Sequence, residues 1–167
     1  YLISCAWEQE RAGYDGGNVL CEGDALEAAQ FVLGTHAAAV LEAGHLPLVI
    51  GGGHEVAWGS WQGLATWAMK QPGKRVGVLN FDAHFDLRAG EVGTSGTPFR
   101  QIAEDCAARN WPFRYACFGV ARATKKPAAP PATSPAARPM ATRPATGLRG
   151  AFVAMAISTL WMFFMPS

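Results

Sequence analysis

The chain has 167 residues and is 50% hydrophobic, which is enough for one domain with a core and excludes a chain that is disordered throughout. Its formal net charge of +1 conceals a division, because all 13 acidic residues precede Cys106, whereas the remainder holds eight Arg or Lys residues. Such a basic region can bind nucleic acid or an anionic membrane, but its Ala- and Pro-rich composition favours neither, and we expect no nucleic-acid partner. The four cysteines show no paired spacing, which indicates free thiols in a reduced, cytoplasmic chain.

The first half of the chain predicts a helix, a short strand and a second helix. The stretch from Asp24 to Gly44 has an acidic residue at the N-cap position, Glu27 three residues later and a closing glycine, which are the start and stop signals of a helix. Leu46 to Ile50 is a short apolar run before three glycines, typical of a buried strand that ends at a tight turn. From His54 to Gln71, apolar residues recur at helical spacing.

The alternation continues through the middle of the chain. Arg75 to Phe81 predicts a second buried strand, and Thr97 to Asn110 predicts a helix with Asn110 near its C-cap. Phe113 to Ala121 then predicts a third strand. Strands that alternate with helices at this spacing favour an α/β domain with a parallel sheet.

This pattern ends at about Ala123. Residues 124–149 are rich in Ala and Pro and have no hydrophobic period, so they cannot bury a core. Residues 150–167 are uncharged and reach the lower limit for a membrane-spanning helix. A tail anchor behind a basic linker is one interpretation. We favour the other, in which the sequence after Ala123 is not native to the domain, as a shifted reading frame would produce. We therefore expect a domain at 1–123, a low-complexity segment at 124–149 and an apolar tail at 150–167.

A group of metal-ligating side chains follows the strand that ends near Phe81. Asp82, His84 and Asp86 are two residues apart, so on an extended chain all three would share one face. In open parallel sheets, ligands bind beyond the carboxyl ends of strands. Two adjacent carboxylates are unfavourable unless a positive charge lies between them, which a divalent cation supplies. The alternative is an Asp-rich capping loop with a surface histidine.

His54 ends the neighbouring predicted strand, and the three glycines before it allow a sharp turn toward the same edge of the sheet. Together with the two aspartates and His84 it gives an imidazole and carboxylate set without thiolate, which suits Mn²⁺ better than a structural zinc ion. His36 and His45 have no such neighbours, and we expect them on the surface or in packing contacts.

The motifs "GGGHE", "NFDAHFDLR" and "SGTPFRQ" resemble the ureohydrolases, the family of arginase and agmatinase, and within it formimidoylglutamase. The resemblance covers roughly Asn18 to Ala123. It implies a three-layer αβα fold with a parallel sheet, which would be incomplete here. It also implies a two-manganese centre that hydrolyses N-formimidoyl-L-glutamate to L-glutamate and formamide in histidine degradation. Another ureohydrolase, of the agmatinase or guanidinobutyrase type, is the alternative, and a non-catalytic metal-binding, membrane-tethered protein is a third.

Position by position, the resemblance assigns roles to the four candidate ligands. His54 would bind one metal and His84 the other, Asp82 would bridge them, and Asp86 would bind beside His54. Asp82 and His84 would thereby support catalysis directly, because two cations activate water for attack on the amidine carbon.

The resemblance also implies a substrate site beyond the ligands. Arg88 would contact an acid group of the substrate, since a guanidinium pairs well with a carboxylate. Ser95, Gly96 and Thr97 match the substrate loop. Arginases carry a histidine proton shuttle soon after the Ser-Gly pair, and the corresponding position here is Phe99.

The family's centre needs two further aspartates from a later strand, and this chain has none after Asp105. We therefore expect weak metal binding and no measurable hydrolysis of a small-molecule substrate by the chain as given. The strand from Phe113 to Ala121 would be an exposed edge. Membrane association is not expected, and the intact family member is compatible with a homo-oligomer.

Overall fold

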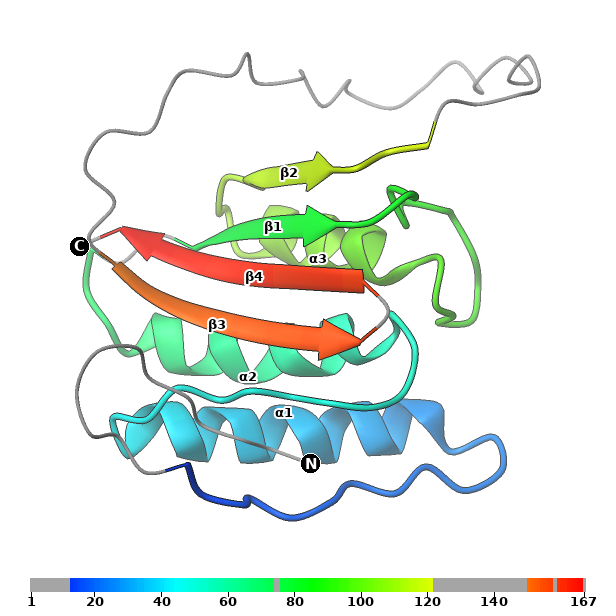
Figure 1. Cartoon of the computed structure of the whole chain (residues 1–167). Helices are drawn as coiled ribbons and strands as arrows, with labels where there is room; N and C mark the ends of the chain where they lie inside the picture. The colour runs from blue at the N-terminus through cyan, green and yellow to red at the C-terminus, as the bar shows by residue number, and fades with distance from the viewer. Residues whose placement is uncertain (1–12, 74–75, 122–149, 158, 167) are drawn as a thin grey trace.

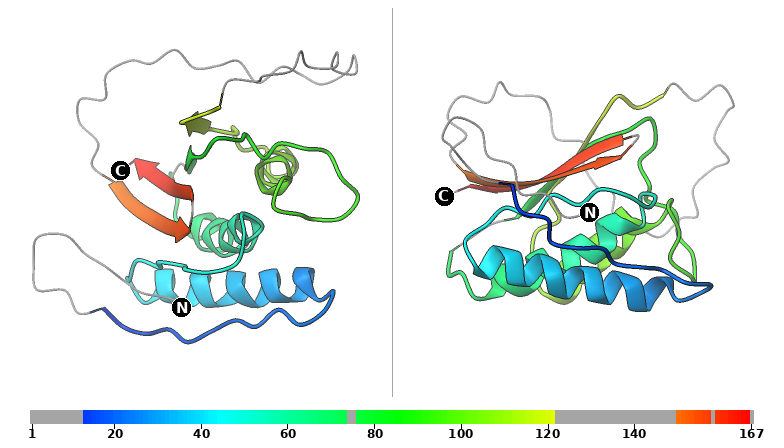
Figure 2. Two further views of the ribbon diagram at one scale, coloured as in Figure 1. Left: turned by 45° about the vertical axis from the view of Figure 1, so that its right-hand side comes forward. Right: turned by 60° about the horizontal axis from the view of Figure 1, so that its bottom comes forward.

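The computed structural model describes residues 13–73, 76–121, 150–157 and 159–166. Its elements in chain order are α1 (Leu26–Glu42), α2 (Val56–Met69), β1 (Gly77–Phe81), α3 (Pro98–Ala108), β2 (Tyr115–Phe118), β3 (Gly150–Ile157) and β4 (Thr159–Pro166). The strands form one sheet in the order β2-β1-β4-β3, in which β1 and β2 are parallel and β4 is antiparallel to both neighbours. The three helices lie on one face of this sheet (Figures 1 and 2). The predicted α/β class is confirmed, and the described residues supply the sheet and one helical layer.

The helices follow their sequence signals closely. α1 begins one residue later than predicted, because Ala25 rather than Asp24 is its N-cap. Gly44 ends it with φ +78°, and the N–H groups of Gly44 and His45 donate to the carbonyls of Leu41 and Val40 in a Schellman motif. α3 ends in the same way, with Asn110 in the left-handed position at φ +56°.

The core lies between the helices and the sheet. α1 and α2 approach closely because glycine faces the neighbouring backbone at Gly34, Gly59 and Gly63. Trp61 of α2 is buried, and its Nε1–H donates to Asp105 of α3 at 2.7 Å. This bond holds α3 against α2 and thereby fixes the helical layer under β1 and β2.

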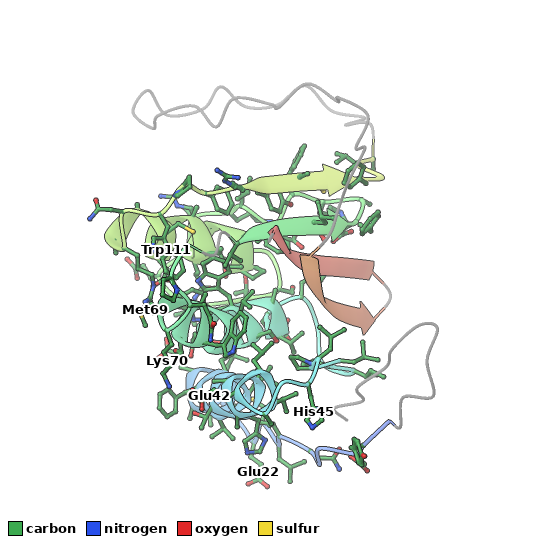
Figure 3. All side chains as sticks on the ribbon, turned by 90° about the vertical axis from the view of Figure 1, so that its left-hand side faces the viewer. Glu22, Glu42, His45, Met69, Lys70 and Trp111 are labelled. Carbon is green, nitrogen blue, oxygen red and sulfur yellow. The ribbon has the colours of Figure 1, made fainter. Side chains whose placement is uncertain are left out.

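Glu42, Lys70 and Trp111, labelled in Figure 3, lie at or just after the C-terminal ends of the three helices. Lys70, just after α2, forms an ion pair with Glu42 at the end of α1. Both side chains are largely exposed, so this pair adds little stability. Trp111 packs edge-on against Trp61 at 6.4 Å between ring centroids and lies under the Arg109 guanidinium.

The interpretations of two apolar runs, one as a strand and one as a membrane-spanning helix, need correction. The strand predicted for Leu46–Ile50 is wrong, because only Val49 forms a β-bridge there. β1 pairs with β2 on one side and with β4 on the other, where Val78 lies opposite Phe163. Both sides of β1 are therefore taken, and Leu46–Ile50 does not pair with it. β4 belongs to the apolar run that we considered as a membrane-spanning helix, and this run forms β3 and β4 instead.

No helix within the described residues is both long and apolar enough to cross a membrane. Residues 124–149 lie outside the described part, and the division of the chain at Ala123 stays a prediction. β2 forms one edge of the described sheet, as expected for the strand predicted at Phe113–Ala121.

Candidate metal centre

His54 is placed by the turn that enters α2. Gly51 and Gly52 have φ values of +115° and +73°, which side-chain-bearing residues rarely adopt, so the chain can reverse here just before the histidine. The Glu55 carboxylate accepts a hydrogen bond from the Gly53 N–H at 2.8 Å. The Glu55 carbonyl accepts another from the buried amide of Gln30 on α1, also at 2.8 Å. The turn is therefore anchored to α1.

Asp82 and Asp86 lie in the loop after β1. The strand ends at Phe81 and the chain then bends, so the prediction that Asp82, His84 and Asp86 share one face of an extended strand is wrong. The Asp82 N–H donates to the Phe118 carbonyl at 2.9 Å, and Asp86 adopts φ +45°. This loop conformation brings the two aspartates to one point.

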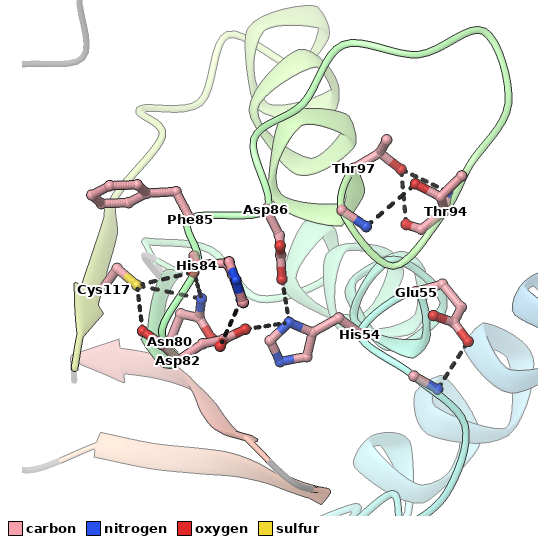
Figure 4. Close-up of polar contacts among 12 residues, drawn as sticks. His54, Glu55, Asn80, Asp82, His84, Phe85, Asp86, Thr94, Thr97 and Cys117 are labelled. Atoms are coloured by element: carbon pink, nitrogen blue, oxygen red, sulfur yellow. Dashed lines mark hydrogen bonds and ion pairs between the residues drawn. The ribbon is translucent and has the colours of Figure 1, made fainter. Parts of the chain in front are cut away.

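The three side chains of His54, Asp82 and Asp86 converge (Figure 4), and their ligand atoms lie within 4.8 Å of one another. His54 Nδ1 is 2.9 Å from Asp82 Oδ2 and contacts Asp86 Oδ2. The side chains are only 10%, 7% and 6% exposed. One ring nitrogen carries at most one proton and cannot satisfy two carboxylates, so a cation fits between them. Oxygen and imidazole donors without thiolate suit Mn²⁺ and similar ions.

His84 lies beside this cluster but outside it. Its Nδ1 is 3.5 Å from Asp82 Oδ1, and its side chain is 69% exposed. His84 and His54 thus contact different oxygens of the Asp82 carboxylate (Figure 4). Its role as a ligand stays a prediction.

Polar side chains beneath the loop support it, and they were not predicted from the sequence. The buried amide of Asn80 on β1 donates to the His84 carbonyl at 3.2 Å. Tyr115 on β2 donates to the Phe85 carbonyl at 2.9 Å, and Cys117 donates to the His84 carbonyl at 3.4 Å. Burial raises the pKa of the Tyr115 phenol well above its usual value, so the hydroxyl keeps its proton. The one available signal was Asn80, a polar residue inside an apolar strand.

Comparison with known proteins identifies the family. The family model described as the arginase family matches residues 5–136. The chain belongs to the arginase family. It is 59% identical over 112 residues to the formimidoylglutamase of Ralstonia nicotianae, a match that covers 66% of this chain and 34% of that protein. It is 56% identical over 120 residues to the formimidoylglutamase of Chromobacterium violaceum, covering 72% of this chain and 38% of that protein.

A solved structure of the same family is also similar. It is a variant of Trypanosoma cruzi formiminoglutamase with Mn²⁺, 34% identical, with a TM-score of 0.53 over 64% of this chain and 34% of that chain. This chain therefore spans about a third of the length of the arginase-family proteins that it matches.

The residues predicted for the substrate site lie outside the three-residue cluster. Arg88 is exposed, its backbone N–H donates to the Gly96 carbonyl at 3.0 Å, and its guanidinium fills the space that a Cβ at Gly96 would need. The Thr97 hydroxyl accepts the Thr94 N–H at 2.9 Å, which builds the turn before α3, while Ser95 is exposed. Arg88 and Thr97 line a cavity of about 590 Å³ that none of the cluster residues lines. Their roles in binding substrate stay predictions.

Phe99 is the residue that the resemblance matches to the proton shuttle of arginases. It is fully buried, and its ring meets that of His54 edge-on, with centroids 6.0 Å apart. Phe99 therefore forms an apolar wall behind the imidazole and cannot transfer a proton.

Proposed function

We propose that this chain provides part of the active centre of a formimidoylglutamase, the enzyme that hydrolyses N-formimidoyl-L-glutamate to L-glutamate and formamide. The observation that carries the proposal is the convergence of His54, Asp82 and Asp86 on one point at the carboxyl end of β1. The identity to curated formimidoylglutamases, 59% and 56%, supports this substrate class within the arginase family.

The proposed roles follow from the positions of the donors. His54 and Asp86 would hold one metal ion, and Asp82 would reach both ions, because its Oδ2 faces His54 and its Oδ1 faces His84. His84 would bind the second ion. When bound, two manganese ions would lower the pKa of water and stabilise charge developing on the amidine.

The chain as given supplies only part of the ligand set. No Asp or Glu follows Asp105, so the second carboxylate pair of the family's centre has no counterpart in this sequence. We propose that the chain binds Mn²⁺ weakly through the described cluster and does not hydrolyse the substrate alone. Arg88, a bidentate carboxylate partner by its chemistry, would contact an acid group of the glutamate moiety in the complete enzyme.

A chimaera tests this function directly. Residues 13–121 would replace the matching third of the Ralstonia enzyme, and hydrolysis of formimidoylglutamate, agmatine and guanidinobutyrate would be compared. We expect activity on formimidoylglutamate alone and its loss in Asp82→Ala, whereas Asp24→Asn, at an exposed position before α1, should be without effect. Preference for agmatine or guanidinobutyrate, or activity that survives Asp82→Ala, would contradict the proposal.

A further inference from the structure

We propose that the Tyr115 hydroxyl, supported by Asn80 and Cys117, is a positioning group that fixes the loop from Asp82 to Asp86. The expected effect of this hydroxyl on metal affinity rests on the proposed function, whereas its expected effect on the conformation of the loop does not. The three side chains come from β1 and β2 and meet the loop from the sheet side (Figure 4 labels Asn80 and Cys117).

Tyr115 makes the shortest of these bonds. Its hydroxyl donates to the Phe85 carbonyl at 2.9 Å and lies 3.1 Å from the Asn80 amide nitrogen, which donates to it. Phe85 directly precedes Asp86, so this bond constrains the backbone at the residue with φ +45°. The left-handed region is less favourable for a residue with a Cβ than for glycine, so this bond helps to hold Asp86 in that conformation.

Asn80 and Cys117 hold the preceding part of the loop. The Asn80 amide donates to the His84 carbonyl at 3.2 Å. The Cys117 thiol lies 3.4 Å from the His84 carbonyl and 3.6 Å from that of Asp82, and thiols are weak donors. Consecutive loop carbonyls therefore depend on side chains of the sheet, and the two ligands Asp82 and Asp86 flank this supported stretch.

The ring of Tyr115 is held independently of its hydroxyl. It packs against Phe99 with centroids 4.9 Å apart and stacks on Phe113 at 5.6 Å. Tyr115→Phe therefore removes the hydrogen bond while it preserves the packing. A bond of this kind to a ligand-bearing loop acts as second-sphere support, whose loss costs about 10- to 100-fold in metal affinity.

The test is amide hydrogen exchange on the full metal-free chain, followed by Mn²⁺ titration. In Tyr115→Phe, we expect the amides of Asp82 and Phe99, which bond to Phe118 and Asp86, to exchange about fivefold faster. Exchange in α1 and at the centre of α2 should be unchanged. Tyr14→Phe is the matched control, because Tyr14 is 63% exposed and distant in sequence from the loop.

The outcomes separate the two proposals. Unchanged loop exchange, or an equal increase throughout the chain, would overturn the positioning role. Faster loop exchange with about tenfold weaker Mn²⁺ binding supports both. Faster loop exchange in a chain whose unaltered form binds no Mn²⁺ supports the positioning of the loop and contradicts the proposed function.

A second pair of variants tests the thiol. Cys117→Ser keeps a hydrogen-bond donor at this position, whereas Cys117→Ala removes it. We expect Cys117→Ala to accelerate loop exchange more than Cys117→Ser does. Equal acceleration would show that the donor is not what supports the loop.

Discussion

Replacing Gly63 with alanine tests the close approach of α1 and α2, on which the position of His54 depends. A Cβ at Gly63 would lie 2.8 Å from the Ala37 Cβ and 2.9 Å from the Ala38 nitrogen, and closer still to the Gly34 carbonyl oxygen. Ordinary contacts between carbon atoms are about 3.5–4.0 Å, so the helices would have to separate by roughly 1 Å here. None of these atoms belongs to a flexible side chain that could move aside.

Two opposed effects decide how much Gly63→Ala changes the free energy of unfolding. Overpacking of this kind costs about 1–3 kcal/mol, whereas alanine gains up to about 1 kcal/mol over glycine inside a helix. We therefore expect Gly63→Ala to lower the free energy of unfolding by about 1–2 kcal/mol. Urea denaturation followed by tryptophan fluorescence would measure it, because Trp61 is buried in the folded chain and becomes exposed on unfolding.

Gly93→Ala is the control, since its nearest neighbour would be the end of the flexible Gln101 side chain at 3.4 Å. It should leave stability unchanged or raise it slightly. A Gly63→Ala variant that is as stable as the unaltered chain would refute the backbone contact between α1 and α2.

Two further predictions concern stability. Burial, with a smaller effect of the Asp105 charge, raises the pKa of the Cys106 thiol from 9.0 to about 11. As the pH rises, the thiol of the unfolded chain therefore loses its proton before the thiol of the folded chain does. The free energy of unfolding keeps the whole contribution of this thiol below pH 9 and falls by about 2–3 kcal/mol as the pH rises to 11. Cys106→Ala should flatten this part of the pH profile, and an equally steep profile would count against the burial of the thiol. Asn110, at φ +56°, ends α3, so Asn110→Gly should stabilise the chain by up to about 1 kcal/mol and Asn110→Val should destabilise it. Thermal unfolding would measure both, and a Val variant as stable as the unaltered chain would contradict the left-handed cap.

Local signals in the sequence predicted most of the helical layer. Gly44 and Asn110 mark the ends of α1 and α3 because a left-handed residue is needed there, and both positions are confirmed. β1 and β2 were predicted from apolar runs of strand length, and their parallel pairing is confirmed.

Pairing between distant segments could not be predicted in this way. Leu46–Ile50 has the composition of a strand, but a strand also needs a partner, and β4 pairs with the edge of β1 opposite β2. The run that contains β3 and β4 is uncharged throughout, so its hydrophobicity alone could not distinguish a helix from a hairpin.

The candidate site was likewise predicted only in part from the sequence. His54, Asp82 and Asp86 were identified by residue type and position at strand ends, and the structure brings them together. The turn at Asp86 and the support from Tyr115 were missed, because they depend on a contact between side chains of β2 and a loop 30 residues earlier in the chain.

The central claim is that His54, Asp82 and Asp86 form a divalent-cation site, and titration of the full chain with Mn²⁺, monitored by electron paramagnetic resonance, tests it most directly. We predict that one Mn²⁺ is bound and that Asp86→Asn weakens its binding at least tenfold, whereas the exposed Asp24→Asn has no effect. Absence of binding by the unaltered chain, or equal affinity in Asp86→Asn, would contradict the claim.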